Sequence, residues 1–107
     1  MTDIIEFFFD FSSPYGYFAT AKIEGLAKKQ GRETVWKPIM LGAAFKETGN
    51  IPLAQQPIKG DYCIHDWERM GEFMDMPWVL PVAFPIPTLA AARAFYWLDD
   101  QDRPLAK

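Results

Sequence analysis

The stretch IIEFFFDFSSPYG, residues 4–16, decides the fold. Residues 4–11 are apolar at nearly every position, which is typical of a buried strand in a mixed or parallel sheet. Ser is a preferred helix N-cap, and Pro fits the first helical position because its missing N–H would have no partner there. The sequence therefore predicts a central strand that passes at Ser13 and Pro14 into a helix.

The start of this helix is a place where an anion could bind. If Ser13 is the cap, the free N–H groups of the first turn and the positive end of the helix dipole point outward from the end of the strand. A thiolate, a carboxylate or a phosphate would each fit. Alternatively, Ser13 only satisfies the end of its own helix. The residues alone leave both interpretations open.

The opening of the chain predicts a βαβ unit. Apolar residues recur from Pro14 with helical spacing, and Gly31 follows as a stop signal. Residues 33–39 are rich in β-forming side chains. A strand, a helix and a second strand in this order imply a right-handed crossover with parallel strands. We therefore expect an α/β fold.

Helices predominate in the remainder of the chain. The pattern predicts helices at 41–48, 61–75 and 88–98, separated by proline-containing irregular segments at 51–58 and 78–87. Two strands alone do not make a sheet of useful size, and a βαβ unit leaves one face in need of cover. We therefore expect the chain to be part of a larger fold.

Composition excludes several classes of protein. The 107 residues include 50% hydrophobic side chains, which is ample for the core of one domain. The net charge of −3 and the lack of a Lys or Arg cluster argue against nucleic acid as a partner. There is no pattern of a secretion signal and no apolar run long enough to cross a membrane, so we expect a cytoplasmic protein without a membrane partner.

The chain has one cysteine, Cys63, and one histidine, His65. A single cysteine excludes an internal disulfide and a CxxC pair, and together with a single histidine it makes a metal site improbable. Cys63 shares an apolar stripe of helical spacing with Trp67, Met70 and Met74, so we expect it to be buried. His65 falls on the opposite, polar face, where a solvated side chain is expected.

Four segments carry motifs that occur in the same order in one known family. They are DFSSPY (10–15), KPIMLGAAF (37–45) followed by TGN (48–50), KGDY (59–62) followed by Asp66, and FPIPTL (84–89) running into ARA (92–94). Each motif is weak alone, but four in order are specific. They resemble the thioredoxin-like family of 2-hydroxychromene-2-carboxylate isomerases and kappa-class glutathione transferases, relatives of the DsbA disulfide oxidoreductases. Pro87 departs from the Asn that isomerases usually carry.

The resemblance implies glutathione as the cofactor and assigns roles to four residues. Ser13 matches the catalytic serine, and Ser13 and Pro14 would meet the glutathione thiol at the helix start. Asn50 matches an asparagine that binds glutathione, and Lys59 matches a lysine near it. The alternatives are a helix-capping role for Asn50 and a solvated charge for Lys59.

The resemblance covers nearly all of this chain but only about half of a family member. It implies that residues 1–40 form the N-terminal βαβ part of a thioredoxin-like domain and that residues 41–107 begin an inserted helical domain. The other half would hold a cis-proline loop and an Asp-Ser motif that contact glutathione. We expect the chain to be a fragment, a truncated gene product or one piece of a two-chain assembly.

The resemblance also implies the chemistry. The segment Ser13-Pro14-Tyr15-Gly16 stands in the place of the C-P-x-C of disulfide oxidoreductases, and its lack of sulfur excludes disulfide exchange. A serine hydroxyl can instead donate a hydrogen bond to the glutathione thiolate. In an isomerase the thiolate adds to a small aromatic carboxylate from aromatic-compound degradation, permits rotation about a bond and leaves again. In a transferase it attacks an electrophile and stays attached. We favour the isomerase, with the kappa-class transferase as the alternative.

Aromatic side chains could form an apolar substrate pocket. Tyr15, Phe45 and Trp78 are the candidates, and core packing is the simpler alternative for each. Asp10 and Asp66 are expected to support the site. The competing hypothesis is a truncated piece without a complete active site that acts only through association. Exposed strand edges and unburied aromatic side chains predict a homodimer or a domain-swapped assembly.

Overall fold

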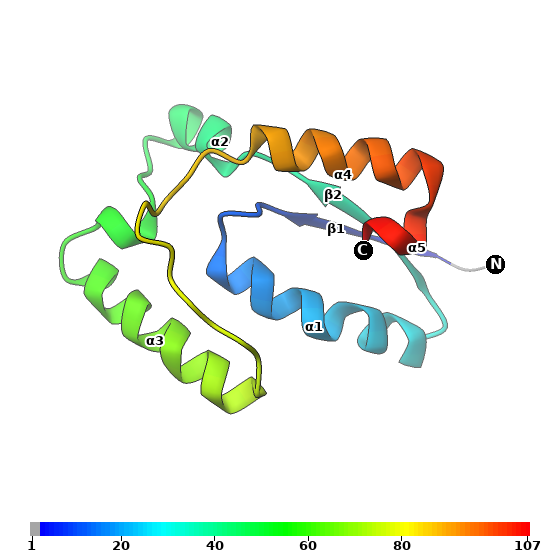
Figure 1. Ribbon diagram of the computed structural model, residues 1–107, viewed down its shortest axis with the longest axis horizontal. Coiled ribbons are helices and arrows are strands. Elements are labelled where there is room, and N and C mark those ends of the chain that lie inside the picture. The colour runs from blue at the N-terminus through cyan, green and yellow to red at the C-terminus, as the bar shows by residue number, and fades with distance from the viewer. Residues whose placement is uncertain (1–2) are drawn as a thin grey trace.

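The computed structural model describes residues 3–107 and confirms the predicted α/β opening (Figure 1). Helices follow the second strand, as predicted. The elements are β1 (Ile4–Phe9), α1 (Pro14–Lys29), β2 (Glu33–Pro38), α2 (Leu41–Thr48), the 3-10 helix η1 (Leu53–Gln55), α3 (Lys59–Met74), α4 (Leu89–Gln101) and α5 (Arg103–Ala106).

The two strands are parallel, as the βαβ interpretation predicted. Ile4 lies opposite Glu33 and Phe9 lies opposite Pro38 in the register of the pair. Gly31 follows α1 with a φ of 65°, a left-handed conformation that a residue without a Cβ atom adopts at little cost. This turn lets the chain leave the helix and enter β2 directly.

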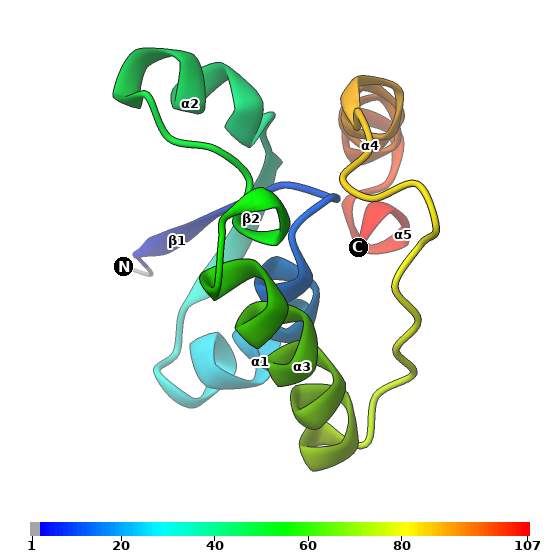
Figure 2. The same ribbon diagram turned by 90° about the vertical axis from the view of Figure 1, so that its left-hand side faces the viewer.

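The prediction of a buried central strand at 4–11 is wrong for the described residues. The sheet there has the order β1-β2, and β1 ends at Phe9. Ile4 and Phe8 are 57% and 54% exposed, whereas Phe9 is 7% exposed. Side chains alternate between the two faces of a strand, and the helices cover only one of them. Figure 2 shows α4 and α5 on one side of the sheet.

One hydrophobic cluster joins the sheet to α4. Phe9 of β1, Trp36 of β2 and Phe95 of α4 are its buried members, and Ile23 of α1 and Ala106 of α5 pack against it. The rings of Trp36 and Phe95 are stacked, with centroids 6.4 Å apart. The predicted domain division at residue 40 stays a prediction, but α4 and α5 return to the sheet from the far side of that boundary.

A second cluster joins α1 to α3 and bears out the predicted apolar stripe. Phe18, Cys63 and Trp67 are its buried residues, and Met70 and Met74 pack against them. His65, on the other face of α3, is exposed as predicted. Helix α3 begins two residues earlier than predicted and α4 ends three residues later. Within residues 3–107, no helix is both long enough and apolar enough to cross a membrane.

Candidate functional site

A cavity of about 270 Å³ opens at the end of the sheet where β1 and β2 terminate. The starts of α1, α2 and α4 gather at this end (Figure 1). Helix N-termini carry N–H groups without intrahelical partners and the positive end of the helix dipole, so this end of the molecule favours negative or hydrogen-bond-accepting atoms. The lining residues are Asp10, Ser12–Tyr15, Met40–Gly42, Phe45, Pro52–Ala54, Trp67 and Phe84–Thr88.

Ser13 caps α1 as predicted and faces this cavity. Its backbone is extended, with φ −97° and ψ 114°, and its Oγ accepts a hydrogen bond of 3.1 Å from the N–H of Gly16. Pro14 takes the first helical position. In this arrangement the Ser13 oxygen is an acceptor, so its hydroxyl hydrogen stays available to a ligand. Capping of the helix and donation to a ligand are therefore compatible roles for one hydroxyl.

Asp10 holds together the segments that form the cavity. Its Oδ1 accepts hydrogen bonds from the N–H of Ser12 at 2.9 Å and from the hydroxyl of Thr88 at 2.7 Å, and its Oδ2 accepts one from the N–H of Leu41 at 2.9 Å. The side chain is 9% exposed. A carboxylate buried among donors from the starts of α1, α2 and α4 fixes how these helices converge.

Tyr15 stands at the rim of the cavity and connects α1 to α3. Its hydroxyl donates a hydrogen bond of 2.7 Å to Oδ2 of Asp66. Burial and the negatively charged Asp66 raise the pKa of the Tyr15 phenol well above its ordinary value. Tyr15 is therefore a neutral hydrogen-bond donor at physiological pH, and Asp66 supports it from α3.

The two other predicted pocket residues have different surroundings. Phe45 of α2 lines the cavity with Tyr15. Trp78 does not line it; its ring packs against Phe18 and Trp67, with centroids 5.4 and 6.1 Å away. Trp78 therefore packs in the core, which was the simpler alternative.

The predicted glutathione contacts Asn50 and Lys59 are not among the lining residues. Both are exposed, and they flank in sequence the Pro52–Ala54 segment, which does line the cavity. The Asn50 side chain accepts a hydrogen bond of 2.9 Å from the N–H of Ile51. It therefore stabilises the turn that follows α2.

Sequence reasoning did not assign Trp67, Thr88 or Ser12 to the cavity. The helical stripe identified Trp67 as a core residue but could not show that a cavity reaches it. Thr88 was noted only as part of the fourth motif, and its contact with Asp10 spans 78 positions of the chain. Such contacts depend on how distant segments pack and leave no local pattern.

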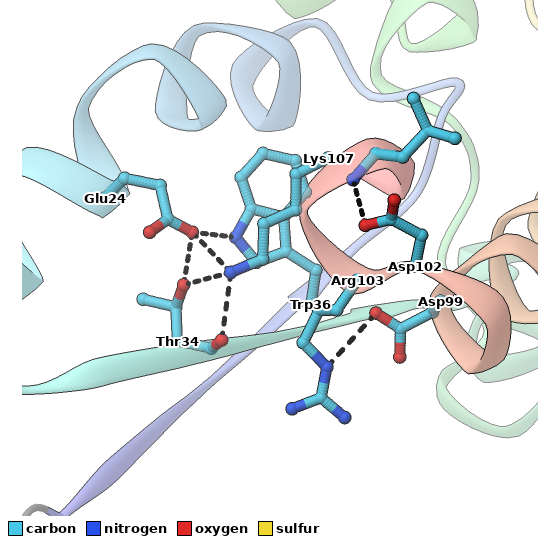
Figure 3. A network of polar contacts seen from close by, with 8 residues as sticks. Glu24, Thr34, Trp36, Asp99, Asp102, Arg103 and Lys107 are labelled. Carbon is cyan, nitrogen blue, oxygen red and sulfur yellow. Dashed lines mark hydrogen bonds and ion pairs between the residues drawn. The ribbon is translucent and has the colours of Figure 1, made fainter.

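A polar network lies near the start of β2 (Figure 3). Oε1 of Glu24 accepts hydrogen bonds from Nε1 of Trp36 at 2.9 Å, from Nζ of Lys107 at 2.8 Å and from the hydroxyl of Thr34. Burial alone would raise the pKa of Glu24, but the hydrogen bonds from Lys107, Thr34 and Trp36 outweigh it and lower that pKa. This network joins α1, β2 and the residue after α5.

A second cavity, of about 300 Å³, lies between this network and the first cavity. Phe9, Trp36, Phe95 and Lys107 are among its lining residues, and it shares Asp10 and Ser13 with the first cavity. Over residues 3–107, no group of three or more His, Cys, Asp or Glu side chains is arranged to hold a metal ion.

Comparison with known proteins relates this geometry to characterised families. A family model described as the DSBA-like thioredoxin domain matches residues 4–107. Glutathione S-transferase kappa 1 of Caenorhabditis elegans is 34% identical, over 94% of this chain and 47% of that protein. The 2-hydroxychromene-2-carboxylate isomerase of Sphingobium xenophagum is 31% identical, over 78% of this chain and 44% of that protein.

The fold comparison agrees with the sequence comparison. The solved structure of a 2-hydroxychromene-2-carboxylate isomerase superposes with a TM-score of 0.73 at 26% identity, covering 89% of this chain and 47% of the other. The chain thus spans about half the length of the relatives that it matches.

Proposed function

Because the chain belongs to the DSBA-like thioredoxin domain family, we propose that the cavity at the start of α1 binds glutathione and that Ser13 stabilises its thiolate. The chain has a thioredoxin-like fold of the DsbA type. The observation that carries the proposal is the Ser13 hydroxyl, which caps α1 with its oxygen and keeps its hydrogen for a ligand in the cavity. The glutathione transferase among the relatives supports the choice of thiol.

The energy required of Ser13 is modest. A thiol with a pKa of about 8.5 is only a few per cent ionised at neutral pH, and lowering that pKa by about two units takes about 2.7 kcal/mol. A hydrogen bond to a charged group contributes about 1.5 to 3 kcal/mol. The helix terminus adds about 0.3 to 1 kcal/mol. Ser13 therefore acts as a hydrogen-bond donor and need not be a nucleophile.

The proposed reaction is an isomerisation. The thiolate adds to an unsaturated aromatic carboxylate, the carbon–carbon bond that has lost its double character rotates, and elimination restores the double bond and releases glutathione. Phe45, Tyr15 and the 84–87 segment supply an apolar wall for an aryl group. The 2-hydroxychromene-2-carboxylate isomerases among the relatives and the structural neighbour support this choice.

The second candidate is a glutathione transferase of the kappa type, in which the thiolate attacks an electrophile and remains attached. It is favoured by the 34% identity to the Caenorhabditis elegans protein over nearly the whole chain. Product analysis separates the two reactions, because an isomerase returns free glutathione whereas a transferase consumes it.

Two further proposals concern contacts beyond the thiol. Asn50 and Lys59 are proposed to contact the peptide part of glutathione from beside the Pro52–Ala54 segment. The chain is also proposed to associate as a homodimer or a domain-swapped assembly, since the outer edge of β1 and the exposed side chains Ile4 and Phe8 are open to another chain.

Calorimetric titration of the 107-residue chain with glutathione tests the thiol site. Ser13→Ala removes the donor and is expected to lower the affinity about tenfold at a pH where the thiolate binds. Thr20→Ala on the same helix serves as the matched control and is expected to bind as the wild type does. Equal binding by Ser13→Ala and the wild type would contradict the proposed role, as would a folded wild-type chain that does not bind glutathione.

A further inference from the structure

Two glycines of α3, Gly60 and Gly71, are buried where another segment packs directly against the helix. A Cβ atom at Gly60 would lie 2.8 Å from the carbonyl oxygen of Ala54 and 3.0 Å from that of Leu53. One at Gly71 would lie 2.9 Å from Cβ of Trp78. Distances under 3.0 Å essentially never occur at real Cβ atoms. Both close approaches therefore depend on a residue without a side chain.

The segment that packs against Gly60 forms part of the first cavity. Leu53 and Ala54 line this cavity, and Gly60 does not. The obstacle at Gly60 is backbone, which cannot turn away as the free end of a side chain can. At Gly71 the obstacle is Trp78, which does not line the cavity. The two glycines thus make the same kind of contact, but only Gly60 makes it with a wall of the cavity.

A strained turn brings Gly60 against this wall. Ile58 has φ 63° and ψ −59°, a conformation that is rare for a β-branched residue. The N–H of Lys59 donates to the carbonyl oxygen of Pro57 at 2.6 Å and closes a three-residue turn. The N–H of Gly60 donates to the carbonyl oxygen of Gln56 at 2.9 Å. Backbone strain persists where surrounding contacts fix it, and the packing of Gly60 is such a contact.

A displaced wall would narrow the cavity. In Figures 1 and 2 the short helix η1 lies between the start of α3 and α2. Leu41, Gly42 and Phe45 of α2 line the cavity together with Leu53 of η1. A side chain at position 60 would push η1 away from α3 and therefore toward α2.

We propose that Gly60 is a positioning residue: it lets η1 pack against the backbone of α3, fixes the Pro52–Ala54 wall and so sets the size of the aryl group that the first cavity accepts. The inference rests on the proposed function, which places an aryl group in this cavity. Because protein interiors are close-packed, a wall that moves by the width of one methyl group changes which ligand fits.

Aromatic alcohols of two sizes test the role of Gly60 without a thiol. Benzyl alcohol has one ring and 1-naphthalenemethanol has two, and neither contains the peptide part of glutathione. Their dissociation constants are measured from the shifts of nitrogen-15 amide signals in the wild type, Gly60→Ala and Gly71→Ala. Urea denaturation first shows that each variant is folded.

We expect Gly60→Ala to weaken binding of the naphthyl probe about tenfold more than binding of the benzyl probe. Gly71→Ala is the matched control, since it adds the same methyl group at a similar distance from its obstacle on the same helix. Although it is expected to lower stability, it should leave the ratio of the two dissociation constants as in the wild type.

A ratio that is the same in all three proteins overturns the role of Gly60. An equal change of the ratio in both variants would assign the effect to lost stability and overturn it too, as would a wild-type chain that binds neither alcohol. In each of these cases, glutathione binding that Ser13→Ala weakens would leave the thiol site standing. The expected ratios in a chain that does not bind glutathione would instead contradict the thiol site alone.

If Gly60→Ala does not fold, the wild type provides the test. On addition of the naphthyl probe, the amide signals of Leu53 and Ala54 are expected to shift because these residues line the cavity. The amide signal of Gly60 should shift with them, since the helix supports the wall, whereas that of Gly71 should stay in place. A probe that binds without moving the signals of Leu53, Ala54 and Gly60 overturns the proposal.

Discussion

Two carboxylates hold the two ends of the sheet in different ways. At the end of β1, Asp10 is buried and accepts hydrogen bonds from two backbone N–H groups and one hydroxyl. Near the start of β2, the side chain of Glu24 is half exposed and forms an ion pair with the ammonium group of Lys107. The Glu24 network joins α1, β2 and the residue after α5, and Oε1 of Glu24 accepts hydrogen bonds from three donors. The Asp10 end fixes three helix starts without a cation, and a cavity of about 270 Å³ opens beside it. One end of the sheet is thus held by a cation, and the other is held by uncharged donors next to a cavity.

The largest effect on stability is expected from Asp10→Ala. The substitution removes the acceptor of three donors, and Leu41 and Thr88 lose their partner inside the protein. Unpaired buried donors and the loss of hydrogen bonds to a charged group together cost about 3 to 5 kcal/mol of the free energy of unfolding. Urea denaturation measures it. Thr88→Val, which removes one of the three hydrogen bonds, is the graded control and should cost about 1 kcal/mol.

A loss from Asp10→Ala no larger than that from Thr88→Val would contradict the picture of Asp10 as the residue that joins three helix starts. The two ends of the sheet would then differ only in solvent exposure.

A smaller loss is expected from Lys107→Met at the other end. Lys107 donates to Glu24 at 2.8 Å and to both oxygens of Thr34 at 2.9 and 3.1 Å. Because Glu24 is half exposed, water can replace part of what the cation provides, and we expect a loss of about 1 kcal/mol. Lys22→Met on the exposed surface of α1 is the control. A loss equal to that from Asp10→Ala would erase the contrast between the two ends.

The pH dependence of stability should identify Glu24. The pKa of Glu24 is lower in the folded chain than its ordinary value of 4.5, so the charged form is the one that folding favours. Its contribution is fully present above pH 4.5 and is lost as the pH falls through the lowered folded pKa. The difference in unfolding free energy between the wild type and Glu24→Gln should therefore shrink in acid. A difference that grows on acidification would contradict this sign.

The sequence could predict those parts of the fold that depend on neighbouring residues. Ser13 and Pro14 carry a local capping signal, and β1, α1 and β2 follow from short-range patterns, so all were predictable. The exposure of one face of β1 was not predictable, because the apolar residues of a strand do not indicate whether other elements cover one face or both. Half of its side chains, Ile4 and Phe8 among them, face outward.

The candidate site was predictable in part for the same reason. Ser13, Tyr15 and Phe45 were singled out, and the cavity brings them together. Thr88 reaches Asp10 across 78 positions, and the unpaired N–H of Trp67 becomes visible only once the neighbours of its ring are known.

The smallest effect is expected from Tyr15→Phe at the rim of the first cavity. The Tyr15–Asp66 hydrogen bond lies at the surface, so its loss should cost less than about 1 kcal/mol. Burial and Asp66 raise the Tyr15 pKa above 10.0, so the neutral phenol stabilises the fold below pH 10.0 and this contribution fades as the pH rises through the raised value. Alkaline titration of tyrosinate absorbance should therefore lose its highest-pH component in Tyr15→Phe. Tyr62→Phe, at a residue that is 63% exposed, is the control and should keep that component. If the highest-pH component survived in Tyr15→Phe, the hydrogen bond that joins Tyr15 of α1 to Asp66 of α3 would be absent in solution, and the rim of the cavity would be open on that side.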